Sequence, residues 1–112
     1  MGVYKPAEVG EALVAEGRFT TAITFTQIAA GVVVIKAAPG RLCRVLVTTA
    51  TTASQAITFY DNASAASGTV VGVIPGAATA GTVVDFGMPC SFGITIGSNA
   101  SLVAGGITVS WI

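Results

Sequence analysis

Any chemistry in this chain has to come from very few side chains. The sequence contains no histidine, which removes the most common general base and the most common zinc ligand. Beyond the N-terminal segment the acidic residues are Asp61 and Asp85, so a carboxylate pair for glycoside hydrolysis would have to be these two. Asp61 opens a polar loop with Asn62, and Asp85 lies within a predicted strand, so both positions favour structural roles. We therefore expect no catalytic site, no metal and no cofactor.

Two other pairs of residues could react or bind. Cys43 and Cys90 are too few for a disulfide framework, and both lie in or beside predicted strands. They are expected as buried free thiols, with a single cross-strand disulfide as the alternative. Tyr60 and Trp111 could stack against a sugar ring, although aromatic residues in strands usually belong to a core or an interface.

Charged residues gather at the N-terminus. Pro6 and the early acidic residues suit a short helix from Ala7 to Glu16, but Gly10 and the following alternation equally allow an extended arm. We expect residues 1–17 to form an arm beside a single domain of residues 18–112, because short amphipathic termini are ordered only when something ties them down. The residues expected to contact a partner are Lys5, Glu8, Glu11, Glu16 and Arg18.

Composition excludes several classes of function. The chain has 112 residues, enough for one domain, and only 9% are charged against about 25% in an ordinary soluble domain. The net charge is zero and lysine and arginine do not cluster, so no nucleic-acid partner is expected. No membrane partner is expected either, because the longest apolar run, Ile28 to Ile35, is far shorter than the roughly 20 residues of a spanning helix.

The elements that would position these side chains are strands. After the Pro39-Gly40 turn the side chains alternate, placing Cys43 and Val45 on one face and Leu42 and Arg44 on the other. No helix is expected after residue 17. The count predicts an all-β, eight-stranded, two-sheet sandwich of jelly-roll type, with a closed eight-stranded barrel as the alternative. The expected strands are Arg18–Thr26, Gly31–Lys36, Leu42–Thr49, Gln55–Asp61, Thr69–Ile74, Gly81–Gly87, Ser91–Gly97 and Ile107–Ile112.

Three details of this arrangement can be predicted. The strand from Gly31 to Lys36 is apolar on both faces, which places it in the middle of a sheet or under another subunit. The string G-T-V-V occurs at Gly68 and again at Gly81, and a hairpin through Pro75 to Ala80 would pair the two copies. Alternation also predicts the buried residues, which are Ile23, Phe25, Val45, Val47, Ile57, Phe59, Phe86, Ile94, Ile96, Val109 and Trp111.

The predicted surface has very little charge. From Val45 to Ile112 there are two charged residues, and the outward strand positions hold threonine, serine, alanine and glycine. Such a surface lacks the charges that usually keep sheet edges from pairing. We therefore expect the domain to be covered by partners.

Three segments give the chain a likeness to a known group of proteins. These are A-P-G-R-L at Ala38 to Leu42, I-T-F-Y-D-N-A-S at Ile57 to Ser64, and G-T-V-V-G-V-I-P-G at Gly68 to Gly76. Over roughly Lys36 to Ile112 the chain resembles small structural proteins of tailed-bacteriophage virions, namely head-decoration, cement or fibre-type proteins. The resemblance implies a β-sandwich that oligomerises, often as a trimer, and binds a capsid. It fixes no functional residue.

Two hypotheses of function follow. The first is a non-enzymatic virion protein, assembled in the host bacterial cytoplasm as a homotrimer, that stabilises the phage head by bridging major capsid subunits. Tail and neck components have similar strands, so the place within the virion stays open. The second is a carbohydrate-binding or adhesin module with Tyr60 or Trp111 as its platform. A shortage of exposed aromatic residues favours the first.

Overall fold

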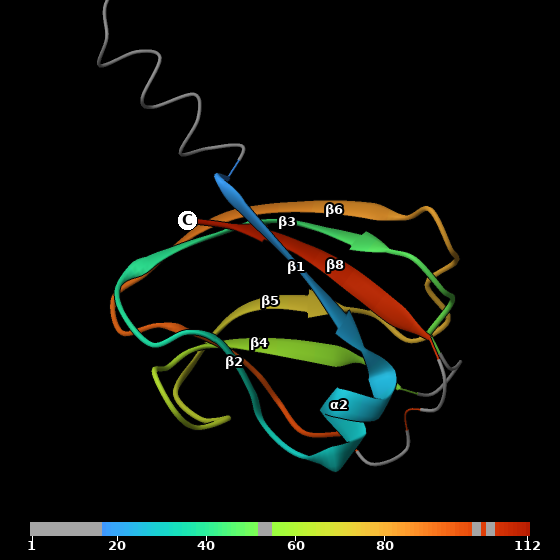
Figure 1. The fold of residues 1–112 in the computed structure, drawn as a ribbon, viewed down its shortest axis with the longest axis horizontal. Helices are drawn as coiled ribbons and strands as arrows, with labels where there is room; N and C mark the ends of the chain where they lie inside the picture. The colour runs from blue at the N-terminus through green and yellow to red at the C-terminus, as the bar shows by residue number, and fades with distance from the viewer. Residues whose placement is uncertain (1–16, 52–54, 100–101, 103–104) are drawn as a thin grey trace, which may run out of the picture.

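Two four-stranded antiparallel sheets lie face to face in this protein (Figure 1). The computed structural model describes residues 17–51, 55–99, 102 and 105–112. The first sheet has the strand order β1-β8-β3-β6, and the second has the order β2-β7-β4-β5. The elements are β1 (Phe19–Thr24), α2 (Phe25–Ala30), β2 (Val33–Lys36), β3 (Gly40–Val47), β4 (Ile57–Asp61), β5 (Thr69–Ile74), β6 (Val83–Cys90), β7 (Ile94–Ile96) and β8 (Gly106–Trp111).

The strands pair in a nested pattern. β4 pairs with β5, β3 with β6, β2 with β7 and β1 with β8, so the chain folds back on the loop after β4. This is the strand order of a jelly roll, and it confirms the predicted all-β two-sheet sandwich. The sheets are not closed into one barrel, because β1 and β6 bound the first sheet while β2 and β5 bound the second.

The core lies between the two sheets and is built by the alternation of the strands. Nine of the eleven residues predicted as buried are 2% exposed or less, while Phe86 and Trp111 are partly buried and pack against the same cluster. Burial of these apolar side chains is the main stabilising contribution in a domain of this size. The buried cluster consists of Ile23, Phe25, Ile28, Leu42, Val45, Val47, Ile57, Phe59, Val71, Ile74, Ala78, Cys90, Ile94, Ile96, Leu102, Ile107 and Val109.

Strand β3 departs from the predicted alternation at its start. Leu42 and Cys43 are consecutive residues and both are buried. The register of β3 against β6 and against β8 shifts between Leu42 and Arg44, which is the mark of a β-bulge. The prediction that Leu42 shares the outer face with Arg44 is therefore wrong, because the extra residue resets the period. Beyond the bulge, Val45 points inward as predicted.

A short helix occupies the place of the expected end of the first strand. α2 begins after Thr24, whose hydroxyl accepts a hydrogen bond from the Gln27 backbone N–H at 3.2 Å. The Thr24 N–H in turn donates to the Gln27 side-chain oxygen at 2.8 Å, which completes a capping box. Phe25 and Ile28 are buried on one side of the helix. The expectation of a strand to Thr26 and of no helix was wrong, although T-x-x-Q is a helix-start signal.

Two predictions about strand neighbours are also corrected. β2 lies at an edge of the second sheet and not in its middle. The two G-T-V-V strings do not form a hairpin, because β5 belongs to the second sheet and β6 to the first. Thr51 anchors the crossing between them: its hydroxyl donates to the Pro75 carbonyl at 3.2 Å and accepts from the Ala78 N–H at 2.7 Å. These bonds hold the connection against the loop that follows β3.

Replacing Phe59 with alanine tests the assigned core. Phe59 is fully buried and its ring centroid lies 5.9 Å from that of Phe86, so Phe59→Ala should lower the free energy of unfolding by about 3–5 kcal/mol. Val83→Ala is the control, because Val83 is 52% exposed on β6 and should cost less than about 1 kcal/mol. Urea denaturation measures both changes, and equal small losses would contradict the assigned core.

Candidate interaction surfaces

Asp61 ties the end of β4 to the turn between β6 and β7. Its carboxylate accepts hydrogen bonds from the backbone N–H groups of Ser91 at 2.9 Å, Phe92 at 2.8 Å and Gly93 at 3.3 Å. Desolvation raises the pKa of Asp61, but the three N–H donors together outweigh it and hold the pKa below its ordinary value. The carboxylate is therefore ionised at neutral pH and acts as a clamp on this turn.

The clamped turn displays Phe92, which is 67% exposed. Gly93 follows it in a crowded position, where a Cβ atom would collide with the backbone of Lys36 and of Asn62. The sequence predicted a strand from Ser91 onward, but β7 begins only at Ile94. Because the backbone of this turn is already fixed, only the side chain of Phe92 would have to be ordered on binding, so Phe92 is a suitable anchor for a partner.

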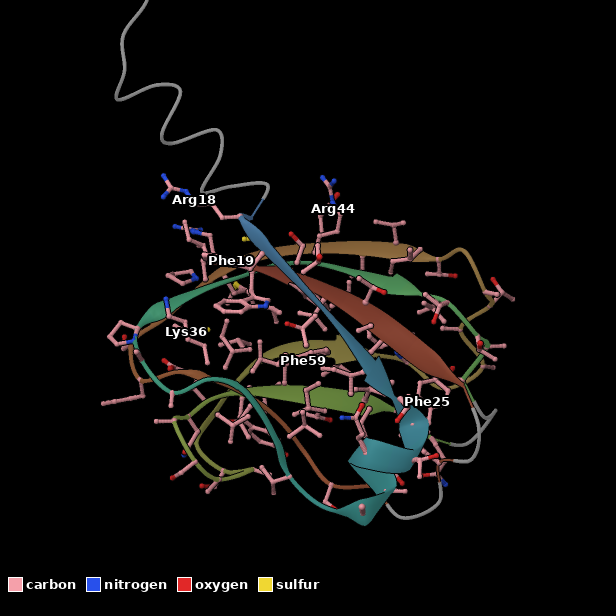
Figure 2. The ribbon with its side chains drawn as sticks, in the orientation of Figure 1. Arg18, Phe19, Phe25, Lys36, Arg44 and Phe59 are labelled. Atoms are coloured by element: carbon pink, nitrogen blue, oxygen red, sulfur yellow. The ribbon has the colours of Figure 1, made fainter. Side chains whose placement is uncertain are left out.

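Aromatic and cationic side chains gather at the same end of the sandwich. The Trp111 ring lies 4.9 Å from that of Phe19, and the Lys36 ammonium lies 5.8 Å from the Trp111 ring centroid. Figure 2 shows Arg18, Phe19 and Lys36 at this end, with Phe25 at the other. Arg41 lies at this end too, because its backbone N–H donates to the carbonyl of Ile112 at 2.9 Å. We name this region the cation–aromatic end; it comprises Arg18, Phe19, Lys36, Arg41, Phe92 and Trp111.

Exposed apolar side chains concentrate on the four edge strands. Six large hydrophobic residues there are between 39% and 52% exposed. Edge strands usually carry charges that prevent pairing with other chains, but the charged residues on these four are Lys36, at the end of β2, and Asp85 on β6. The six residues are Phe19 on β1, Val34 on β2, Val70 and Val73 on β5, and Val83 and Met88 on β6.

The outer face of the first sheet is mostly uncharged. One cross-strand row consists of Ala22, Thr108, Leu46 and Val83, and the next of Thr20, Ser110, Arg44 and Asp85. Arg44 and Asp85 form a salt bridge across β3 and β6. The other residues of the two rows are uncharged, and Ala22, Thr20 and Ser110 among them have small side chains that lose little rotamer entropy on contact.

The structure separates the residues that were considered for catalysis or sugar binding. Asp61 contacts Ser91, whereas Asp85 lies six residues earlier, about 20 Å along an extended chain. Tyr60 lies on the second sheet and Trp111 on the first, so they do not form one platform. Within the described ranges no group of three or more potential metal ligands occurs, and no helix there is long and apolar enough to cross a membrane.

The residues predicted to contact a partner are described only in part. Lys5, Glu8, Glu11 and Glu16 lie outside the described residues. Arg18 is exposed, and its backbone N–H donates to the Trp111 carbonyl at 2.9 Å, which places it at the cation–aromatic end. Sequence reasoning did not single out Phe92. The flanking Ser91 and Gly93 are turn formers and were a local signal that could have been used.

Both cysteines are buried free thiols, as the sequence predicted in preference to a disulfide. Burial raises the pKa of the Cys43 thiol, against the opposing effect of Arg41 and Arg44, and burial likewise raises the pKa of Cys90. Adding reductant should therefore leave the melting temperature unchanged. Calorimetry with and without reductant measures this, and a fall of several degrees would reveal a stabilising disulfide.

Asp61→Asn should destabilise the protein and alter its response to acid. A carboxylate whose folded-state pKa is lowered contributes stability above its unfolded pKa, near 3.8, and that stability is lost as the pH falls through the folded value. We expect a loss of about 1 kcal/mol at pH 7 and a flatter stability curve below pH 4. Asp85→Asn removes a carboxylate from an exposed salt bridge and serves as the control. Equal effects at pH 7 would contradict the clamp.

Comparison of the chain with models of known families, with curated proteins and with solved structures finds no match. The surfaces described above therefore supply the argument for function. Chief among them are the exposed apolar edge strands and the cation–aromatic end, which share no residues except Phe19. Both lie on the outside of the sandwich and consist largely of exposed or partly exposed apolar, aromatic and basic side chains.

Proposed function

We propose that the protein is a structural virion component that acts by association. In this proposal it forms a homo-oligomer, preferably a trimer, and stabilises a tailed-phage head as a decoration or cement protein that bridges major capsid subunits. The observation that carries the proposal is the exposure of apolar side chains on all four edge strands. An isolated domain with such edges tends to pair with other chains.

The size of the apolar gain favours a closed or repeated assembly over a simple pair. Covering a half-exposed valine contributes about 1 kcal/mol, so a contact between two β5 edges, which covers two valines on each copy, contributes about 4 kcal/mol. This gain only matches the smallest cost of association, about 4 kcal/mol in lost translation and rotation. A closed ring of three copies makes three contacts of this size against two such costs, so ring closure supplies the surplus that a simple pair lacks.

The virion setting is supported by the resemblance of Lys36 to Ile112 to phage structural proteins and by the jelly-roll order, which is frequent in viral capsid proteins. The sugar-binding alternative has less support. Trp111 is already engaged, because its indole N–H donates to the Thr21 hydroxyl at 2.9 Å and its ring contacts Phe19. Tyr60 is half-buried within the second sheet.

Lysine substitutions on the edges test the association. We expect light scattering to give the mass of an oligomer at micromolar concentration. At least one of Val34→Lys, Val70→Lys and Val83→Lys should shift that mass to the monomer, because a lysine on an edge strand prevents pairing. Leu46→Lys is the control, since Leu46 is also exposed but lies on the inner strand β3. Dissociation by Leu46→Lys alone would place the interface on the sheet face.

The virion assignment has its own test. Mass spectrometry of purified particles from the phage or lysogen whose genome encodes the chain should find the protein in a fixed ratio to the major capsid protein. Genes for a capsid protein, portal or scaffold beside its own gene would agree with this. Absence of the protein from the particles, together with binding on a glycan array, would replace the proposal with the sugar-binding alternative.

A further inference from the structure

The charges of the chain are divided between two parts of opposite sign. Residues 1–16 contain three glutamates and one lysine, whereas residues 17–112 contain four basic and two acidic residues, so the net charges are −2 and +2. Both acids of the sandwich are already engaged, Asp61 with backbone N–H groups and Asp85 with Arg44. The other basic residues have no carboxylate partner within the described ranges; they are Arg18, Lys36 and Arg41.

These basic residues surround exposed aromatic rings. Phe19 is about half exposed, Trp111 is partly exposed and Lys36 lies over its ring. A partner that fits this surface has to offer both carboxylates and apolar side chains. Residues 1–16 carry both kinds, interleaved along a short stretch: Val3, Tyr4, Glu8, Val9, Glu11, Leu13, Val14 and Glu16. Their charge and composition complement those of the cation–aromatic end.

We propose that residues 1–16 of one copy bind the cation–aromatic end of a neighbouring copy. This inference rests on the proposed homo-oligomer and specifies how its copies are linked. The glutamates face Arg18, Lys36 and Arg41, and the apolar side chains of the segment cover Phe19 and Trp111. Covering the rings supplies the apolar contribution, while the charges set orientation and register.

Gly17 joins residues 1–16 to the first sheet next to the cation–aromatic end. It has a φ of 88° and packs so closely against Ser110 that a Cβ atom would collide with the serine hydroxyl. The next residue, Arg18, donates its backbone N–H to the Trp111 carbonyl. Binding of the segment to its own end is therefore the competing arrangement, and the mixing experiment below distinguishes it from binding to a neighbouring copy.

The length of the segment permits this exchange. Sixteen residues span about 24 Å as a helix and about 50 Å when extended. Both lengths are at least twice the roughly 10 Å that separates two packed sheets, so the segment can extend past a contact between two copies. An exchanged segment also adds to the contacts made by the edge strands, because the cation–aromatic end shares only Phe19 with their exposed apolar residues.

Trp111 provides the measurement, because it is the single tryptophan of the chain and lies in the proposed site. In the full-length protein its emission should move to shorter wavelength as concentration rises, since the neighbouring segment excludes water from the ring. Raising the salt from about 0.1 M to about 1 M should move the midpoint of this emission change to a higher protein concentration, because exposed charge pairs are then screened. Light scattering at each concentration records the mass independently.

Two charge-inverted full-length variants make the test specific. One carries Glu8→Lys and Glu11→Lys, and the other carries Arg18→Glu and Lys36→Glu. Each alone places like charges together, so its midpoint should rise by roughly tenfold or more. An equal mixture of the two should restore the emission change, because each segment then meets an end of opposite charge. Binding within one copy predicts no effect of mixing. The neutral pair Glu8→Gln and Glu11→Gln is the control for charge reversal.

The outcomes separate this inference from the proposed function. An emission that does not depend on concentration, or a mixture that restores nothing, would overturn the exchange. If the mass still shows an oligomer in that case, the association stands and only the exchange is refuted. A monomer at every concentration would overturn both.

Discussion

The first sheet depends on the last strand of the sandwich. β8 lies between β1 and β3, where Val109 is paired with Thr21 on one side and with Val45 on the other. Without β8, β1 has no neighbour in its sheet and β3 has only β6. Pairings of such long sequence separation carry a large loop-closure entropy, which burial of the core has to offset. The sandwich therefore forms as a unit, with both termini of the domain meeting at the same end.

The nested pairing makes the two ends of the sandwich different. At one end α2 covers the core, with Phe25 and Ile28 fully buried and the Phe25 N–H bonded to the Gly105 carbonyl at 2.8 Å (Figure 1). At the other end the chain enters β1 and leaves β8, so the outermost residues of these strands, Phe19 and Trp111, have no cover of this kind. The exposed ring of Phe19 and the partly exposed ring of Trp111 lie where the chain enters β1 and leaves β8, and Gly17 meets the first sheet at the same place.

The alternation of apolar and polar residues predicted those features of the fold that depend on neighbouring residues in the sequence. Alternation identified the strands and most of the core, because a period of two along a strand sorts its side chains between core and solvent. It failed at Leu42, where a bulge changes the period, and at Phe25, where the capping pair of Thr24 and Gln27 begins a helix. It could not find the clamp on Phe92 either, since Asp61 reaches partners about 30 residues away in the sequence. Edge positions likewise depend on the whole topology, so the placement of β2 in the middle of a sheet was wrong, while its cover by another subunit stays a prediction.

The chain has few charged residues, and both acidic residues of the sandwich have identified partners. Asp61 holds a turn and Asp85 neutralises Arg44, so within the described part of the chain neither acid balances the basic residues near Trp111. The other glutamates of the sequence, Glu8, Glu11 and Glu16, precede the sandwich. Electroneutrality of the chain is thus a property of segment and sandwich together. In the proposed exchange, contact between copies brings these opposite charges together beside the exposed aromatic rings, so that the charges fix the orientation of a contact whose apolar part comes from the rings.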